Sequence, residues 1–337
     1  MRVLFLTVGN ETVASSRVRI YSYANFLERE GIEYKIIPFT SRAKCQRVLK
    51  LQKDNIVQYI YEFFYKVYVY ITVLVLAKKY DAIFIQKIIP AKTVILLLRK
   101  LNRNIIFDLD DAIYLNNDIE HVLKNAARVV TSNKYLKGFA ARFNNKVHEL
   151  ISPVNVSERS PEPKKGVTIG WIGGMETSSY LDPLLPVFQR LKEKNKELSV
   201  EFMGPGRRAY FESFGIKVHD WSIGKEKEFL EKLGIGIMPL TDDKWARGKA
   251  GYKLLLYMSR GISCVTSPVG INNEIIKDEV NGLLANNTNE WYDKLKRLIE
   301  DNALRKKLGE EARETVKRSY SYEVAAPKFI NILKNNT

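Results

Sequence analysis

The chain has 337 residues, of which 45% are hydrophobic and 27% are charged. This composition is typical of a globular protein of about two domains, and it excludes a largely disordered chain. The formal net charge is +16, with +11 in residues 1–160 and +5 in the remainder. Such an excess predicts an anionic partner, such as a phosphorylated substrate, an acidic lipid or a nucleic acid, and it says nothing about the fold.

Two cysteines, Cys45 and Cys264, share no spacing with each other or with the three histidines. They indicate neither a disulfide framework nor a zinc site, so a reduced, cytoplasmic protein is expected. The apolar start, residues 1–8, is too short for a signal peptide and is followed by a polar stretch without a cleavage motif. We therefore expect it to be a buried first strand.

The first half alternates short apolar runs with segments of helix length. Strands are predicted at 2–8, 33–39, 82–86, 105–108 and 128–131, with a helix at 16–30. The second half repeats the pattern, with strands at 167–172, 199–203, 235–239 and 263–266, helices at 181–194 and 252–260, and a helical tail from residue 290. This alternation predicts βαβ units and a mainly parallel sheet in each half.

The expected fold class is therefore α/β, with two doubly wound, Rossmann-like domains that face a central cleft. Residues 158–166 hold two prolines, a glycine and five charges, and they form the predicted linker. The domains would span 1–157 and 167–320, with a closing helix within 321–337. In open α/β sheets ligands bind beyond the carboxyl ends of the strands, so we look for site residues in the loops there.

The loop after the first strand, GNETVASSRVR, leads into a helix. Ser15 or Ser16 could cap this helix, and its N-terminal amides suit an anion. Arg17 and Arg19 lie in the first turn, where the helix dipole disfavours cations, which indicates either a bound anion or solvated surface charges. No GxGxxG or GxxxxGK[ST] motif is found, so neither a Rossmann NAD site nor a P-loop is expected.

Three carboxylates, Asp108, Asp110 and Asp111, lie at the end of the strand that begins at residue 105. They could hold a divalent cation, accept hydrogen bonds from sugar hydroxyls, or cap a helix. Carboxylates this close raise one another's pKa unless a cation or a hydrogen-bond donor compensates. The cluster is therefore a candidate site.

Glycines follow two strands of the second half. Gly173 and Gly174 lie in GWIGGMETSSY, and Gly204 lies in the similar turn MGPGRR. Glycine permits positive φ angles and a close approach of a ligand to the backbone. These turns are therefore candidate ligand contacts.

The most informative segment is MPLTDDKWARGKAGYKLLL, residues 238–256. Arg247 and Lys249 precede a predicted helix, and Lys253 lies one turn inside it. Together with the amides near Gly251, these cations would form a pocket suited to a diphosphate.

The sequence around these residues resembles glycosyltransferase family 4, whose members are retaining enzymes with the GT-B fold. The stretch GKAGYKLLLYMSRGISCVTSPVGINNEII is similar to the C-terminal signature of that family. IGWIGGMETSSYL, PLTDDKWARGK, IIFDLDDAIY and SSRVR match a branch of the family in the same order. The resemblance implies that the C-terminal domain binds a nucleotide-sugar, that the N-terminal domain binds the acceptor, and that the closing helix can cross back to the first domain.

With this resemblance we assign roles to residues. Catalytic roles fall to Asp110, Asp111, Lys249 and Lys253. Donor contacts are expected from Gly173, Gly174, Gly204, Arg247, Lys249, Gly251, Tyr252, Lys253 and Gly270, and acceptor contacts from Ser16, Arg17 and Arg19. The implied reaction is retaining transfer of a sugar from a nucleotide-diphosphate-sugar, the co-substrate, to an acceptor hydroxyl, with neither metal nor cofactor. Its main demand is stabilisation of negative charge on the leaving phosphate, for which Arg247, Lys249 and Lys253 are the candidates.

Two departures from the family pattern concern carboxylates. Many members have two glutamates eight positions apart, and Gly248 and Leu256 occupy those positions here. Leu256 cannot accept a hydrogen bond from a ribose, so ribose recognition must differ. The family often has a histidine where Asp110 stands, and Asp110 could accept a hydrogen bond from the transferred sugar instead.

A basic stretch precedes an apolar one in the first half. Residues 42–53 contain Arg42, Lys44, Arg47, Lys50 and Lys53 without an acidic residue, and 18 of the 22 residues in 56–77 are apolar, among them five tyrosines. Glu62 and Lys66 within the apolar stretch argue against a membrane-spanning helix. We expect a buried helix packed on the sheet; the alternative is an interfacial helix on an anionic membrane, as a lipid-linked acceptor and a peripheral location at the inner face of the cell membrane would require.

Three rival functions are considered. A nucleic-acid-binding protein would also be basic, but no RNA-binding signature is present and no nucleic-acid partner is expected. A sugar-nucleotide epimerase with the GT-B fold and a catalytically inactive sugar-nucleotide-binding homologue remain alternatives to a transferase.

Overall fold

This computed structural model describes residues 1–49, 52–157 and 166–335. Two compact units are present. Unit 1 contains Met1–Pro153, Gly248–Ala250 and Tyr322–Thr337, and unit 2 contains Val154–Arg247 and Gly251–Ser321. The predicted linker lies outside the described residues except for Gly166, so the domain boundaries given above stay a prediction.

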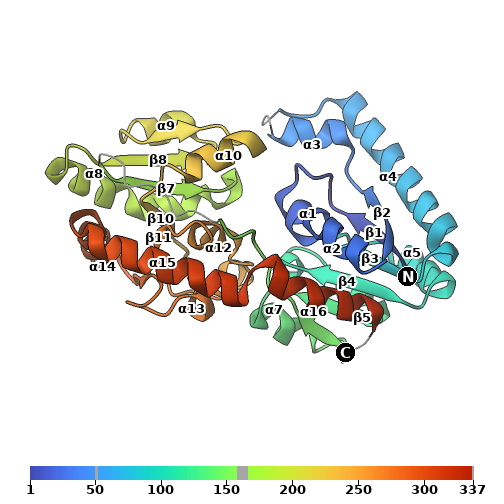
Figure 1. The fold of residues 1–337 in the computed structure, drawn as a ribbon. Coiled ribbons are helices and arrows are strands. Elements are labelled where there is room, and N and C mark those ends of the chain that lie inside the picture. The colour runs from blue at the N-terminus through green and yellow to red at the C-terminus, as the bar shows by residue number, and fades with distance from the viewer. Residues whose placement is uncertain (50–51, 158–165, 336–337) are drawn as a thin grey trace. The chain divides into compact units, whose positions relative to one another are not determined.

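Unit 1 is built on a parallel sheet of six strands in the order β2-β1-β3-β4-β5-β6 (Figure 1). The strands are β1 (Arg2–Thr7), β2 (Glu33–Pro38), β3 (Ala82–Gln86), β4 (Ile105–Leu109), β5 (Arg128–Thr131) and β6 (Val147–Glu149). Nearly every residue of the central strands β1, β3, β4 and β5 is buried, as expected for a parallel sheet covered by helices on both faces.

The helices of unit 1 connect these strands. They are α1 (Ala14–Arg19), α2 (Ala24–Arg29), α3 (Arg42–Leu49), α4 (Ile56–Leu76), α5 (Lys92–Leu101), α6 (Glu120–Asn125), α7 (Lys134–Ala140) and α16 (Tyr322–Lys334). The predicted helix at 16–30 is divided: a 3-10 turn at Tyr21–Tyr23 separates α1 from α2. Ile20, Tyr23 and Leu27 all lie in the core, where each is only 1% exposed.

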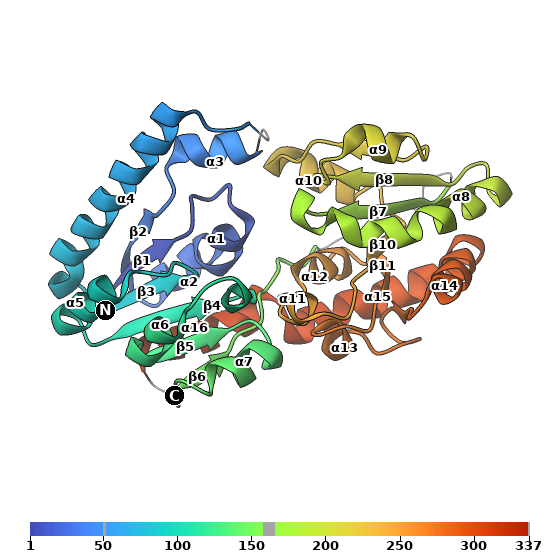
Figure 2. The same ribbon diagram turned by 180° about the vertical axis from the view of Figure 1, so that it is seen from behind.

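The C-terminal helix α16 belongs to unit 1, and both ribbon views draw it beside the strands of that unit (Figures 1 and 2). Phe329 is fully buried, and its ring centre lies 4.5 Å from that of Tyr23 and 5.5 Å from that of Phe84. The hydroxyl of Tyr322 donates a hydrogen bond to the carbonyl of Val18 at 3.0 Å. Helix α16 therefore packs into the same hydrophobic core as the first strands of unit 1.

Unit 2 repeats the architecture with a second parallel sheet, in the order β12-β11-β10-β7-β8-β9. Its strands are β7 (Thr168–Ile172), β8 (Ser199–Met203), β9 (Lys217–His219), β10 (Ile235–Met238), β11 (Ser263–Thr266) and β12 (Leu283–Leu284). Its helices are α8 (Leu185–Lys194), α9 (Arg208–Glu212), α10 (Ile223–Leu230), α11 (Lys244–Arg247), α12 (Tyr252–Met258), α13 (Asn272–Ile275), α14 (Thr288–Glu300) and α15 (Asn302–Ser319). The predicted fold class of two parallel, Rossmann-like α/β sheets is confirmed.

Helix α4 differs from what the sequence analysis favoured. Among the described residues it is the one helix long and apolar enough to cross a membrane by length and composition. It is not buried on the sheet: only Glu62, Val69 and Val73 of its 21 residues are buried, and Phe63 and Phe64 are each 64% exposed. The expectation of a core helix is therefore wrong, because only a narrow stripe of α4 contacts the domain.

Candidate functional site

In unit 1 the ends of β1, β3 and β4 bring polar residues together, and the first pair is Arg19 with Asp108. Both side chains are almost fully buried, and Arg19 Nε donates a hydrogen bond to Asp108 Oδ2 at 3.1 Å while a second one joins its Nη2 to Oδ1. Burial alone would lower the pKa of Arg19, but the Asp108 carboxylate outweighs this and the net pKa is raised. Arg19 is thus an internal ion-pair partner, neither a solvated surface charge nor an exposed anion ligand.

Ser16 lies inside α1 rather than at its cap, since the helix begins at Ala14 and Val13 holds the N-cap position. Its hydroxyl accepts a hydrogen bond from the amide of Gly9 at 3.2 Å and donates one to Gln86 Oε1 at 3.0 Å. The residue joins the first loop to the end of β3, and it is fully buried. Arg17 is more exposed, and its guanidinium donates to the carbonyl of Glu11. The roles of these residues in acceptor binding stay predictions.

Lys87, directly after β3, joins two of the predicted carboxylates. Its Nζ lies 3.1 Å from Asp110 Oδ1 and 2.9 Å from Asp111 Oδ2. Its backbone has a φ of 53°, a left-handed conformation that is uncommon for a residue with a side chain. Such strain persists where the surroundings hold a residue in place, and functional sites are one setting in which it occurs.

The two carboxylates respond differently to this lysine. Burial raises the pKa of Asp110 to about 6, against the opposing effect of Lys87 and with a further increase from Asp111 and Asp108. Burial also acts to raise the pKa of Asp111, but Lys87 and Lys249 outweigh it and the net pKa is lowered. Asp110 Oδ1 accepts no hydrogen bond within the described structure, because its contact with Lys87 lacks hydrogen-bond geometry. The protein's own donors therefore leave acceptor capacity on this buried oxygen unused.

Lys249 belongs to unit 1 through its contacts. Its Nζ lies 3.7 Å from Asp111 Oδ1, and its carbonyl accepts a hydrogen bond from Asn133 Nδ2 at 2.9 Å. The adjacent Gly248 lies so close to Ala112 that a Cβ there would be 2.6 Å from the Cβ of Ala112. The structure thus explains the absence of a glutamate at position 248, because no side chain fits there.

In unit 2 the two glycine turns meet each other. The amide of Gly173 donates to the carbonyl of Met203 at 3.0 Å, and a Cβ on Gly204 would lie 2.6 Å from the carbonyl oxygen of Gly173. Gly204 has a φ of 77°, whereas neither Gly173 nor Gly174 has a positive φ. A side chain at position 173 would clash with its neighbours, because its Cβ would lie 2.5 Å from the Trp171 ring and 2.7 Å from Lys253 Nζ.

Lys253 lies in the first turn of α12 and reaches this pair of turns. Its Nζ lies 4.4 Å from the ring centre of Trp171, a cation–π contact, and it donates a hydrogen bond to Thr177 Oγ1 at 3.2 Å. Thr177 in turn donates from its amide and its hydroxyl to the carbonyl of Gly174. An ammonium group is thus fixed beside the turn that contains Gly173 and Gly174.

The remaining predicted donor residues lie around the start of α12. Gly251 precedes this helix with a φ of 69°, and Tyr252 is its first residue. Gly270 has a φ of 55°, and a Cβ there would lie 3.0 Å from the backbone of Arg247. The guanidinium of Arg247 donates two hydrogen bonds to Asp242, at 2.6 and 2.9 Å.

The structure therefore brings six of the predicted site residues together in two groups, one in each unit. Asp110, Asp111 and Lys249 lie together in unit 1, and Gly173, Gly204 and Lys253 lie together in unit 2. The sequence analysis missed Lys87, although its position just after a buried strand was a usable signal. It also missed Trp171 and Thr177, which lie within the GWIGGMETSSY motif but were given no role.

In the part of the chain that the structure describes, two other features, a possible metal-ligand cluster and a surface hollow, do not form a site. Within the described residues, no three His, Cys, Asp or Glu side chains gather as metal ligands, and Asp108 and Asp110 face Arg19 and Lys87 instead.

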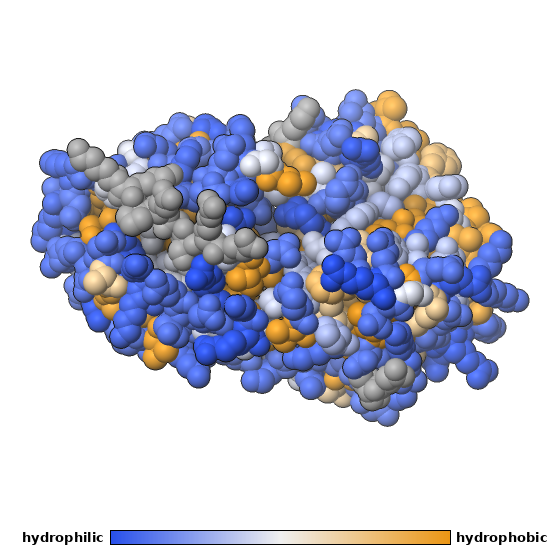
Figure 3. All heavy atoms as spheres, in the orientation of Figure 1, coloured by the Kyte–Doolittle hydropathy of each residue, from blue (hydrophilic) through white to orange (hydrophobic). Residues whose placement is uncertain are grey.

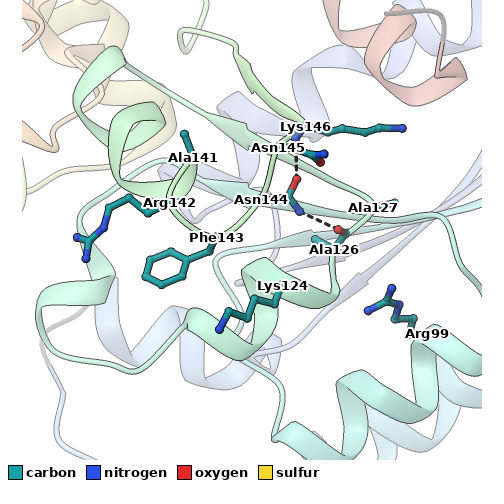
Figure 4. Close-up of a pocket in the computed structure, with 10 residues that line it drawn as sticks. All are labelled: Arg99, Lys124, Ala126, Ala127, Ala141, Arg142, Phe143, Asn144, Asn145 and Lys146. Carbon is teal, nitrogen blue, oxygen red and sulfur yellow. Dashed lines mark hydrogen bonds between the residues drawn. The ribbon is translucent and has the colours of Figure 1, made fainter.

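A hollow of about 500 Å³ in unit 1 is lined by Arg99, Lys124, Ala126, Ala127, Ala141, Arg142, Phe143, Asn144, Asn145 and Lys146. Figure 4 shows that Arg142 and Lys146 point away from each other, so these cations do not converge on one ligand. The hollow lies beside residues that precede β5 and β6, and thus not at the carboxyl ends of the strands.

Comparisons with known proteins concern the family of one segment and the fold of the whole chain. Residues 166–301 match the family model described as glycosyl transferases group 1. No curated protein sequence matches the chain.

Solved structures resemble the chain over its whole length. A sucrose-phosphate synthase from Thermosynechococcus elongatus has a TM-score of 0.75 at 13% identity, covering 99% of this chain and 98% of that one. The lipopolysaccharide outer core galactosyltransferase WaaB has a TM-score of 0.70 at 16% identity, with full coverage of both chains. HepE from Anabaena, solved with UDP and glucose, has a TM-score of 0.69 at 12% identity, covering 99% of this chain and all of that one.

At these identities the structural likeness establishes the fold alone, and the family match concerns residues 166–301. Two parallel six-stranded sheets with helices, together with this likeness, identify the GT-B fold of two Rossmann-like domains. The chain has the GT-B fold, and its residues 166–301 are similar to the family described as glycosyl transferases group 1.

Proposed function

We propose that the protein is a retaining glycosyltransferase of family 4. It moves a sugar from a nucleotide-diphosphate-sugar to the hydroxyl of an acceptor. The observation that carries the proposal is Lys253, which is fixed beside the Gly173 and Gly204 turns inside the segment that matches the family model. A uridine diphosphate sugar is the donor class to test first, because HepE was solved with UDP-glucose.

In this reaction the bond between the anomeric carbon and the diphosphate oxygen breaks. A bond forms from that carbon to the acceptor oxygen on the same face, and the acceptor proton leaves with the nucleoside diphosphate. Negative charge develops on the leaving phosphate, so a positioned cation lowers the barrier. Lys253 meets this requirement in unit 2, and Lys249 is the second candidate.

The acid cluster of unit 1 has a complementary role in the proposal. Asp110 Oδ1, which has no hydrogen bond within the described structure, accepts one from a sugar hydroxyl. Asp111 stays ionised between Lys87 and Lys249 and keeps both ammonium groups in place. No metal ion or cofactor enters this mechanism.

The acceptor is proposed to be a sugar on a lipid-linked or cell-surface glycan. The naming of WaaB as a lipopolysaccharide galactosyltransferase and the basic excess in residues 1–160 support this choice. The protein would then work in the cytoplasm, as a peripheral protein at the inner face of the cell membrane. Nucleic acid is not a proposed partner.

A panel of nucleotide diphosphates and nucleotide-sugars tests the proposal. We expect one donor to raise the melting temperature, and proton NMR of the reaction with a sugar acceptor to show a product with the anomeric configuration of the donor. Inversion at the anomeric carbon would contradict the retaining mechanism. Interconversion of the donor without an acceptor would indicate an epimerase, and stabilisation without any turnover would indicate an inactive binding protein.

Lys253→Ala and Lys249→Ala give a second test. Each is expected to lower kcat by about 10²–10³-fold, the cost of losing one group that stabilises charge in the transition state. Lys306→Ala on α15, where the side chain is 74% exposed, is the matched control and should keep wild-type turnover. Wild-type turnover in Lys253→Ala, with an unchanged circular dichroism spectrum, would remove the phosphate role.

A further inference from the structure

Helix α4 presents a broad apolar surface to solvent. Eleven of its large apolar side chains are 39–71% exposed: Ile56, Val57, Tyr59, Ile60, Tyr61, Phe63, Phe64, Val67, Tyr68, Ile71 and Val75. Leu96 and Leu97 on the adjacent α5 are 43% and 45% exposed. In Figure 3, orange spheres gather along the segment where Figure 1 draws α4. Soluble proteins rarely expose contiguous apolar patches of this kind without a binding role.

The opposite side of α4 is attached to unit 1 along its length. Glu62 accepts a hydrogen bond from the amide of Ser41 at 3.2 Å and another from its hydroxyl. The hydroxyl of Tyr65 donates to the carbonyl of Pro38 at 3.0 Å, and Val69 and Val73 are fully buried. A spanning orientation would break these contacts and leave Glu62 without partners in hydrocarbon. The helix can therefore meet a membrane only while lying along its surface.

Cations flank the exposed apolar face of α4. Glu62 is the only acidic residue of the helix, and it is buried against the domain. Lys66, one turn later on the same side, has its ammonium 5.4 Å from the ring centre of Phe39. Lys53 before the helix and Lys78 and Lys79 after it are exposed. The apolar face thus has cations near both ends, which suits an anionic lipid surface, and its tyrosines suit the headgroup level.

The basic stretch before α4 contributes less than its sequence suggests. Lys44 and Arg47 both form ion pairs with Asp54, which lies just outside the stretch 42–53. Lys50 lies outside the described residues. The cations that were expected to attract a membrane are thus partly neutralised within the protein, and the apolar face of α4 becomes the stronger candidate contact.

We propose that the exposed face of α4, extended by Leu96 and Leu97, docks in the plane of a bilayer that contains anionic lipid. This inference rests on the proposed membrane location and names the surface responsible for it. A second copy of the chain is the less suitable occupant, because pairing two such faces would bring the flanking lysines Lys53, Lys78 and Lys79 against those of the other copy.

Vesicle flotation of the full chain tests the proposal. We expect the wild type to float with phosphatidylcholine vesicles that contain phosphatidylglycerol, and less with phosphatidylcholine alone. Phe63→Ser/Phe64→Ser should weaken partitioning about 100-fold, since each buried phenyl ring contributes about tenfold or more. The control Ile223→Ser/Val280→Ser removes two side chains of unit 2 that are 50% and 49% exposed, and it should float like the wild type. Lys44→Gln/Arg47→Gln should also stay close to the wild type.

Four outcomes would overturn the proposal. In the flotation experiment they are a wild type that does not float and a Phe63→Ser/Phe64→Ser variant that floats normally. The third is retention of the protein in the membrane after carbonate extraction, which would indicate a spanning helix. The fourth is a dimer in light scattering that the double phenylalanine variant converts into a monomer. Donor binding is measured separately by thermal shift. Donor binding without flotation would reject the docking surface alone, and flotation without donor binding would reject the proposed function alone.

Discussion

Asp108, Asp110 and Asp111 lie within four positions of one another, yet neighbouring cations compensate their charges unequally. Asp108 is paired with the guanidinium of Arg19, and Asp111 lies between two lysines. Asp110 is 4% exposed and shares Lys87 with Asp111. Burial therefore acts on Asp110 with the least compensation, and its carboxyl group keeps a raised pKa at the place where the mechanism needs a hydrogen-bond acceptor.

We predict that Asp110→Asn stabilises the protein at pH 7. The pKa of Asp110 is about 6 in the fold, against about 3.9 in an unfolded chain, so between pH 4 and 6 the folded state binds more protons. Stability contributed by this group is therefore present below about pH 4 and is lost as the pH rises to 6. The substitution should raise the free energy of unfolding at pH 7 by on the order of 1–3 kcal/mol, and the gain should vanish near pH 4.

Urea unfolding of the wild type and Asp110→Asn at pH 4, 5, 6 and 7 measures this difference. Asp118→Asn, at an exposed residue of the same chain segment, is the control and should show no such trend. A stability difference that does not change with pH would show that Asp110 does not titrate in this range. The same variant should lose turnover, because an amide is a weaker acceptor than a carboxylate.

At the scale of elements, the sequence predicted the central strands well and the surface poorly. The strands at 82–86, 128–131, 199–203 and 263–266 have the predicted bounds, because fully buried parallel strands read as short apolar runs. The edge strands β6, β9 and β12 were missed, since a strand of two or three residues is too short to show periodicity. Helix α4 is apolar on all sides, so periodicity could not show which side faces solvent.

The candidate site shows the same limit. Loops after buried strands could be identified from the sequence; they contain Asp110, Gly173 and Lys249, and Lys253 follows such a loop in the first turn of α12. The pairing of charges could not be predicted from the sequence, because it depends on packing between residues far apart in the chain. Lys87 and Asp111 are 24 positions apart, and Arg19 and Asp108 are 89 apart.

The close approach of Gly248 to Ala112 gives an element-scale prediction. Restoring the family's glutamate by Gly248→Glu should destabilise the protein by about 1–3 kcal/mol, because its Cβ would lie 2.6 Å from a methyl group and 3.1 Å from a backbone nitrogen. The melting temperature should fall by about 2–4 °C for each kcal/mol. Gly224→Glu is the control, since a Cβ at Gly224 meets nothing within 4 Å. A variant that is as stable as the wild type and binds donor more tightly would show that the missing carboxylate, and not space, limits this position.

At the scale of the whole molecule, the order of the chain differs from the order of its units. Unit 1 begins at Met1 but is completed by α16, which follows all of unit 2 in the sequence. Phe329 contacts the rings of Phe5, Tyr23 and Phe84, so residues separated by about 300 positions share one core. The stability of unit 1 must then depend on the last helix of the chain.

Phe329→Ala tests this dependence. Removing a fully buried phenyl ring costs about 3–5 kcal/mol. All four tryptophans, Trp171, Trp221, Trp245 and Trp291, belong to unit 2, so their fluorescence reports the unfolding of that unit, whereas circular dichroism reports both units. The variant should lower the urea midpoint seen by circular dichroism while the fluorescence midpoint changes little. Phe211→Ala, an equally buried phenylalanine of unit 2, should shift the fluorescence midpoint instead. If Phe329→Ala lowers the fluorescence midpoint as much as Phe211→Ala does, then α16 stabilises unit 2 as well, and its assignment to unit 1 alone is wrong.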